Sequence, residues 1–176
     1  MTSIVVMGVA GCGKSSLGAT LAKALGWPLV EGDDHHSPAN VAKMRAGTPL
    51  TDADRADWLD ALATALQARP LGAVLTCSAL KRGYRDRLRA ALPGLRFVHL
   101  QLTRDEARRR VAARAGAGDG HYFNPALVDS QFDTLEPPEG EPGVLGLDAT
   151  RALPDLTAEV LRWTDAGAPR PAQPEA

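Results

Sequence analysis

The sequence predicts an α/β fold of three layers, in which a mostly parallel five-stranded sheet is flanked by helices. Two observations support this class. Short apolar runs alternate along the chain with segments of helical periodicity, which is typical of βαβ units. A glycine-rich phosphate-binding motif also stands between the first apolar run and the first helical segment. The length of 176 residues suits one domain with a core of its own.

The motif occupies residues 8–15 and fits the pattern G-x-x-x-x-G-K-[ST]. Glycines permit backbone conformations in which successive N–H groups converge on one anion. Lys14 is then expected to reach the β- and γ-phosphates, and the Ser15 hydroxyl is expected to bind Mg²⁺. The helix that follows adds the positive end of its dipole. Strand, loop and helix stand in the required order, so the sequence predicts a P-loop NTPase fold.

The remaining elements follow from apolar runs, helical spacing and helix-capping residues. Strands are predicted at residues 3–7, 28–31, 72–77, 96–102 and 143–147. Helices are predicted at residues 14–25, 38–46, 52–68, 82–91, 104–114, 124–130 and 154–164. Thr103 and Glu106 form a capping-box pattern, and Thr51 with Asp54 resembles one with a shorter acid.

One domain is predicted over residues 1–164, followed by a Pro/Ala-rich tail at 165–176 that is expected to be disordered. A glycine-rich stretch at 115–120 suits a moving lid, which we place at about 114–136, although a surface loop fits its composition nearly as well.

Composition narrows the function classes. A net charge of −1 argues against nucleic-acid or membrane-surface binding through bulk charge. The chain has no apolar run long enough for a transmembrane helix, and its apolar N-terminal stretch is already used by the first strand. Its two cysteines indicate neither a disulfide framework nor a zinc site. We therefore expect a cytoplasmic protein with no nucleic-acid or membrane partner.

Acidic residues follow the second predicted strand, where Glu31 and Asp33 would stand beside the phosphate loop. A carboxylate there could accept a proton from an attacking hydroxyl or help to hold Mg²⁺, but a solvated acidic turn fits equally well. The third strand ends in Ser78 without the terminal Asp of a Walker B motif. Metal binding would therefore shift to Ser15 and the acidic segment. With no guanine-reading motif either, a GTPase or motor ATPase is disfavoured.

Basic residues follow the third strand, among them Lys81 and Arg85. They could hold an anionic substrate, because arginine binds carboxylates with two parallel hydrogen bonds. An exposed helix face is the alternative.

Together these residues resemble the thermoresistant gluconokinase family, which is itself similar to shikimate kinase in architecture. The resemblance runs in colinear order from about residue 4 to 164 and is more specific than the loop alone. It is carried by residues 7–15, 33–36, 49–52, 54–55, 58–59, 77–81, 84–85, 120–121 and 130–136, with Asn40, Lys43 and Met44. The chain departs from the family at Glu31, where members often carry Asp.

The resemblance implies a P-loop kinase domain that uses ATP and Mg²⁺ to phosphorylate D-gluconate on its 6-hydroxyl, and it implies a homodimer. The implied catalytic residues are Lys14, Asp33 and Arg114. The implied cofactor-binding residues are Gly8, Gly11, Cys12, Gly13, Lys14, Ser15, Ser16 and Arg110, with Ser15 on the metal. The implied substrate-binding residues are Asp33, His36, Arg55, Ser78, Lys81, Arg85, His121 and Gln131, with Arg55 or Arg85 on the gluconate carboxylate.

Two alternatives stay open at this point. One is a kinase for another small hydroxy acid or polyol such as shikimate. The other is a nucleotide-dependent switch or binding module that acts on a protein partner.

Overall fold

The structure is a computed structural model that describes residues 3–116 and 126–166. Five parallel strands form one sheet in the order β2-β3-β1-β4-β5. The strands are β1 (Ile4–Met7), β2 (Leu29–Glu31), β3 (Val74–Thr76), β4 (Arg96–Gln101) and β5 (Val144–Asp148). The predicted α/β class, with a five-stranded sheet between helices, is confirmed.

The first strand lies in the middle of the sheet because all of its side chains are apolar. Ile4 and Val6 pack in one core cluster, and Val5 and Met7 pack in the other. A strand covered on both faces reads as a continuous apolar run, which is typical of parallel sheets. The phosphate loop therefore follows directly after the most buried strand of the sheet.

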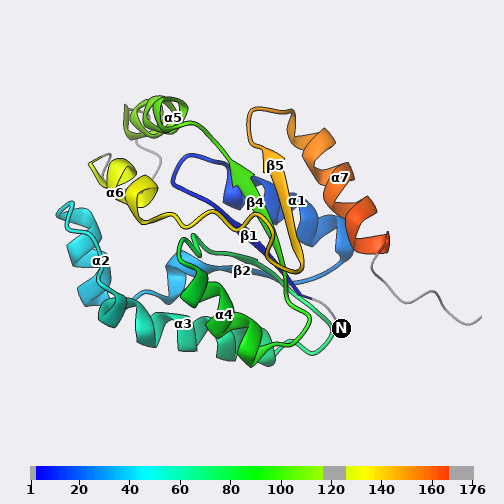
Figure 1. Ribbon diagram of the computed structural model, residues 1–176. Helices are drawn as coiled ribbons and strands as arrows, with labels where there is room; N and C mark the ends of the chain where they lie inside the picture. The colour runs from blue at the N-terminus through cyan, green and yellow to red at the C-terminus, as the bar shows by residue number, and fades with distance from the viewer. Residues whose placement is uncertain (1–2, 117–125, 167–176) are drawn as a thin grey trace, which may run out of the picture.

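Helices cover both faces of the sheet (Figure 1). One face carries α1 (Lys14–Leu25) and α7 (Leu153–Ala166), and the other carries α3 (Asp52–Gln67) and α4 (Arg82–Ala91). The remaining helices, α2 (Pro38–Arg45), α5 (Arg104–Gly116) and α6 (Leu127–Thr134), gather around the carboxyl ends of the strands. In parallel sheets this is the end at which ligands bind.

Most predicted elements agree with the structure to within a few residues, but three differ. A 3₁₀ helix, η1 (Gly32–His35), follows β2 and was not predicted. The helix expected at 124–130 is found at Leu127–Thr134, with residues 124–125 outside the described part of the chain. Helix α7 continues to Ala166, into the segment predicted to be a tail from residue 165; residues 167–176 lie outside the described ranges.

Of the two predicted capping boxes, the one with the shorter acid is complete, and the one with the usual Glu is not. Thr51 and Asp54 form the complete reciprocal box at the start of α3. At α5 the Thr103 hydroxyl accepts from the Glu106 N–H, but the Glu106 carboxylate accepts from Arg109 and Arg110 instead of bonding back. Arg109 holds both carboxylate oxygens of Glu106, at 2.8 and 2.7 Å, and such a two-point bond between ionised partners outcompetes a single bond to a backbone N–H.

Within the described ranges, no helix combines the length and apolar character that crossing a membrane requires.

Candidate active site

The phosphate loop owes its shape to three glycines with positive φ. Gly8, Gly11 and Gly13 have φ values of 138°, 81° and 97°, in the region that L side chains rarely adopt. Space forbids a side chain at Gly8 as well, because a Cβ there would lie 2.7 Å from the Leu100 carbonyl oxygen and 2.9 Å from Cys12 Sγ. Gly13 is the N-cap residue of α1.

The N-terminus of α1 is open for an anion. No side chain caps it, and its first turn contains no acidic residue. The first N–H groups of a helix lack partners within the helix, so an uncapped end attracts negative charge. Lys14 folds back over the loop, where its Nζ donates to the carbonyl oxygens of Gly8 (3.2 Å) and Val9 (3.1 Å).

A cavity of about 700 Å³ opens in front of this loop. It contains eleven of the predicted site residues: Gly11, Gly13, Lys14, Ser15, Ser16, Asp33, His36, Arg55, Ser78, Arg114 and Gln131. Asp34, Leu80, Leu127, Ser130 and Thr134 also line it. One continuous space thus connects the phosphate loop with residues from η1, α3, the segment after β3, α5 and α6.

A polar cluster joins the loop to strands β2 and β3. The Ser15 hydroxyl donates to Glu31 Oε2 at 3.2 Å, and the Thr76 hydroxyl donates to the same oxygen. Thr76 also accepts from the Gly32 N–H at 3.4 Å. The end of β3, which carries no Asp, therefore supports the Glu31 carboxylate next to Ser15.

The acidic segment after β2 forms η1, and Trp58 fixes it in place. Trp58 Nε1 donates to the Gly32 carbonyl oxygen at 2.7 Å, and its ring stacks on His36 with centroids 4.3 Å apart and an interplanar angle of 12°. Asp33 is exposed to the cavity beside them. Burial, with a smaller contribution from Arg55, lowers the pKa of His36 from 6.5 to about 4, although Asp33 opposes the shift. His36 is therefore neutral at ordinary pH.

Two of the predicted cationic substrate residues lie around Tyr84. Arg55 lines the cavity, with its guanidinium 5.7 Å from the Tyr84 ring centroid. Lys81 lies at the same distance from that ring, but its Nζ is paired with Asp52 at 2.7 Å and it does not line the cavity. The hydrogen bond from Lys81 holds the pKa of Asp52 below its usual value. Arg55 is thus the cation of this pair that faces the cavity.

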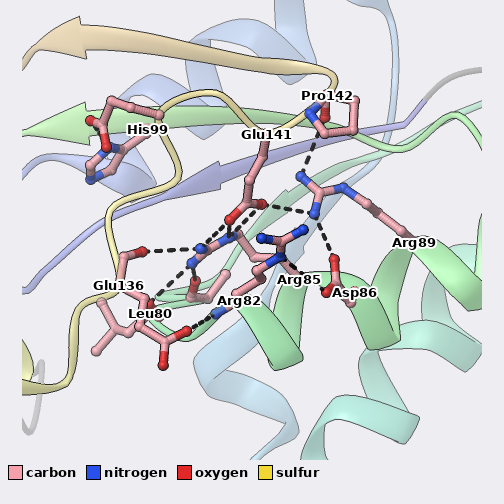
Figure 2. A network of polar contacts seen from close by, with 11 residues as sticks. Leu80, Arg82, Arg85, Asp86, Arg89, His99, Glu136, Glu141 and Pro142 are labelled. Atoms are coloured by element: carbon pink, nitrogen blue, oxygen red, sulfur yellow. Dashed lines mark hydrogen bonds and ion pairs between the residues drawn. The ribbon is translucent and has the colours of Figure 1, made fainter.

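Arg85 is not placed where the sequence suggested. Its side chain is fully buried, does not line the cavity, and bonds to Glu141 and to backbone carbonyls (Figure 2). A guanidinium whose N–H groups are already used inside the protein cannot also bind a carboxylate in the cavity. We therefore withdraw Arg85 from the set of substrate-binding residues.

Other predicted residues contact the loop rather than the cavity. Cys12 is buried and its pKa is raised by that burial, so its thiol stays protonated. Arg110 donates to the carbonyl oxygen of Ala149 at 3.2 Å and to that of Gly11 at 3.5 Å. His121 lies outside the described residues, as do residues 117–125 of the predicted lid at 114–136.

Gln131 of α6 lines the cavity and contacts the phosphate loop. Its Oε1 accepts from the Ala10 N–H at 2.6 Å, so α6 is hydrogen-bonded directly to the phosphate loop.

Sequence reasoning gave no role to Trp58 and Thr76. Each had a weak signal: a tryptophan in the middle of a helix with an otherwise ordinary apolar face, and a polar residue at the end of an apolar strand.

Comparison with known proteins decides the family. Residues 4–138 match the AAA domain family. The chain is 44% identical over 162 residues to a gluconokinase of Gluconobacter oxydans, covering 90% of this chain and 88% of the relative. The chain belongs to the gluconokinase family. It is also 38% identical over 161 residues to the thermoresistant gluconokinase of Escherichia coli, covering 89% of this chain and 90% of that protein.

A solved structure agrees with this assignment. The crystal structure of a gluconokinase from Sinorhizobium meliloti superposes with a TM-score of 0.84 at 43% identity, covering 94% of this chain and 92% of that one. The resemblance drawn from the sequence motifs is therefore confirmed, and a gluconokinase is an enzyme with a nucleotide-binding P-loop. The switch or binding-module alternative is not favoured.

Proposed function

We propose that this gluconokinase transfers the γ-phosphoryl group of ATP to the 6-hydroxyl of D-gluconate, giving 6-phosphogluconate and ADP. The observation that carries the proposal is the composition of the cavity. Lys14 and Ser15 of the phosphate loop share it with Asp33, His36 and Arg55. These three residues offer a carboxylate, a neutral imidazole and a guanidinium that faces the cavity. The first pair suits a nucleotide, and the second group suits a hydroxylated acid.

ATP would be held by the loop and the open end of α1. The residues assigned to it are Gly8, Gly11, Cys12, Gly13, Lys14, Ser15, Ser16 and Arg110. Gly8 and Cys12 act through the loop backbone, because neither lines the cavity and the Cys12 thiol is buried. Among the described residues, Lys14 bonds to the loop carbonyls of Gly8 and Val9, which a phosphate oxygen can replace. Arg110 borders the loop near Ala149, where an adenine ring could stack on its guanidinium.

Mg²⁺ fits the residues next to the loop. Its preferred ligands are oxygens, and it usually keeps several waters while binding one or two side chains and substrate phosphates. Ser15 Oγ and the Glu31 carboxylate, 3.2 Å apart, are such a pair. The described residues contain no group of three or more His, Cys, Asp or Glu side chains that could hold a metal alone. Bound there, Mg²⁺ would neutralise phosphate charge during transfer.

Asp33 would orient the sugar hydroxyl. It accepts a hydrogen bond from the 6-hydroxyl and takes its proton as the new P–O bond forms. Because the transition state of phosphoryl transfer is loose, the proton need not leave beforehand. Lys14 would offset the charge on the γ-phosphoryl oxygens, and Arg114 from α5 would add to it, so most of the rate enhancement comes from positioning and charge.

The rest of the acceptor site would recognise the acid and its hydroxyls. Arg55 is the cation that faces the cavity, so we assign the gluconate carboxylate to it. His36, Ser78 and Gln131 line the same space and would bind hydroxyls. Lys81 would join them only by leaving Asp52, and the role of His121 stays a prediction.

The homodimer and the cytoplasmic location also stay predictions, which size-exclusion chromatography and cell fractionation test.

An ADP-release assay with a panel of acceptors tests the proposed function. D-Gluconate should accelerate ADP release from MgATP strongly over the rate without acceptor, and shikimate and other sugar acids should do so far less. Equal acceleration by shikimate, or none by gluconate, would refute the proposal.

A further inference from the structure

A buried network of charges lies behind the cavity wall (Figure 2). At its centre is Arg85 of α4, whose side chain is 0% exposed, paired with Glu141, whose side chain is 7% exposed. Arg85 Nε donates to both Glu141 carboxylate oxygens, at 3.0 and 3.2 Å, and Nη2 donates to Oε1 as well. Arg89, one turn further along α4, donates to Glu141 Oε2 at 2.8 Å. Glu141 is thereby held from two positions on one helix.

The side of the Arg85 guanidinium that points away from Glu141 is hydrogen-bonded to the turn after β3. Its Nη1 donates to the carbonyl oxygens of Ala79 (2.8 Å) and Leu80 (3.1 Å). Ala79 needs such support, because its φ of 45° makes it the one non-glycine residue with positive φ in the described part of the chain. The residues on either side of it, Ser78 and Leu80, line the cavity.

The same guanidinium also holds the chain that leaves α6. Arg85 Nη2 donates to the Glu136 carbonyl oxygen at 3.0 Å. The Glu136 N–H donates to the Leu80 carbonyl oxygen at 2.9 Å, and the Glu136 carboxylate accepts from the Arg82 N–H at 2.6 Å. One side chain therefore ties the exit of α6 to the turn after β3.

Both tied segments reach the phosphate loop. The Ser78 carbonyl oxygen accepts from the Gly8 N–H at 3.3 Å, and Gln131 of α6 accepts from the Ala10 N–H at 2.6 Å. The wall of the acceptor site is thus connected at one end to Arg85 and at the other to the loop that would hold ATP.

Stability alone is a poor explanation for this network. Burying an ion pair costs desolvation, and replacing both partners with apolar residues of similar volume is often neutral for stability. The hydrogen bond from Arg85 holds the pKa of Glu141 below its usual value, so the carboxylate is charged at neutral pH despite its burial. What an apolar pair could not do is donate to the carbonyl oxygens of Ala79, Leu80 and Glu136.

We propose that Arg85, oriented by Glu141, is a positioning residue of this kinase. It fixes the Ser78–Leu80 turn and the exit of α6, so that the cavity wall formed by these two segments, the acceptor wall, keeps its position relative to the phosphate loop. This inference rests on the proposed function, since it assigns that wall to gluconate. Arg85 touches no substrate. Its loss should therefore weaken the use of gluconate and leave the binding of ATP, which the loop and α1 control, nearly unchanged.

The test is the double variant Arg85→Met/Glu141→Leu, which removes both charges and leaves Arg89 paired with Asp86 at 3.0 Å. We expect KM for gluconate to rise by about tenfold or more, since small misplacements of a bound reactant are costly. KM for ATP should stay within about twofold, while the melting temperature should fall, because the carbonyl oxygens of Ala79, Leu80 and Glu136 lose a donor. Arg87→Met is the matched control, because Arg87 lies on the same helix and pairs with Asp60 in solvent; it should behave as wild type.

Unchanged KM for gluconate in the double variant would overturn the proposal, whatever happens to the melting temperature. Should the double variant not fold, Arg85→Lys is the variant to measure, because it keeps the charge but has fewer hydrogen-bond donors. It should show a smaller rise in KM for gluconate. A wild-type KM in this variant would overturn the proposal. Absence of gluconate-dependent ADP release from the wild-type protein and from Arg87→Met would instead refute the proposed function itself.

Discussion

The two sides of the cavity are built in different ways. The side that would hold ATP is one continuous stretch, from Gly8 to Ser16, set on the most buried strand of the sheet. The side that would hold gluconate is collected from η1, α3, the turn after β3 and α6, and it is held together from behind by Arg85 and Glu141.

This difference explains which parts of the site can change independently. A loop whose shape comes from positive-φ glycines carries its geometry in its own sequence. A wall made of distant segments depends on residues that never meet the substrate. Substitutions in the loop should therefore damage phosphate handling directly, whereas substitutions behind the wall should change acceptor use. The following predictions probe this contrast, from the largest expected effect to the smallest.

Lys14→Ala should have the largest effect, because it removes the one loop side chain expected at the β- and γ-phosphates. We expect kcat to fall by about 10³-fold or more, since electrostatic stabilisation carries most of phosphoryl transfer. Steady-state ADP release measures it. Lys23→Ala, exposed on the same helix, is the control and should match wild type. Near-normal turnover in the Lys14 variant would contradict the phosphate-loop assignment.

Asp33→Asn probes the acceptor side alone. Losing the carboxylate that orients the hydroxyl should lower kcat by about 10²- to 10³-fold, the range typical of proton-transfer groups. Binding of ATP, followed by calorimetry, should stay close to wild type because Asp33 does not belong to the loop. The neighbouring variant Asp34→Asn should lose much less activity. If the two variants were equally impaired, the specific role of Asp33 would be wrong.

Gly8→Ala tests whether the loop geometry itself matters. The new Cβ would lie 2.7 Å from the Leu100 carbonyl oxygen at a φ of 138°, so we expect a loss of about 2 kcal/mol or more in unfolding free energy. Weaker ATP binding should accompany it. Gly83→Ala is the matched control, since its Cβ would meet no atom within 4 Å and it lies in a helix. That variant should be neutral or stabilised by about 0.5–1 kcal/mol. Urea unfolding compares them.

The smallest effect concerns His36 and pH. The pKa of His36 is about 4 in the folded protein and 6.5 in the unfolded chain. Protonation of His36 therefore favours the unfolded chain, and its contribution to the free energy of unfolding is fully present only above pH 6.5. That contribution is lost as the pH falls through 4. His36→Asn should flatten this part of the curve of unfolding free energy against pH. An NMR titration of the His36 ring with a midpoint near 6.5 would contradict the buried, stacked environment.

The sequence predicted the elements whose signals are local. The strands and most helices follow from apolar runs and spacing, and the phosphate loop follows from its glycines, Lys14 and Ser15. The sequence predicted the local structure less well where contacts between distant elements determine it. η1 is held by Trp58 from another helix, and the Glu106 carboxylate prefers two arginines to its own cap.

Arg85 shows the same limit at the site. In the sequence it is one arginine among several on a helix that follows Ser78 and Leu80, which do line the cavity. Its partner Glu141 lies 56 positions away, in a segment with no motif of its own. Only the packing of α4 against that segment distinguishes a buried arginine that positions the wall from an exposed one that could bind an acid.

The central claim is that the loop delivers phosphate to the 6-hydroxyl of the acid bound across the cavity. Phosphorus NMR of the product made from MgATP and D-gluconate tests it most directly. We predict one new phosphomonoester signal that couples to both hydrogens of carbon 6 and appears as a triplet. A doublet would place the phosphate on a secondary hydroxyl, and inorganic phosphate alone would mean hydrolysis without an acceptor; either result would contradict the account.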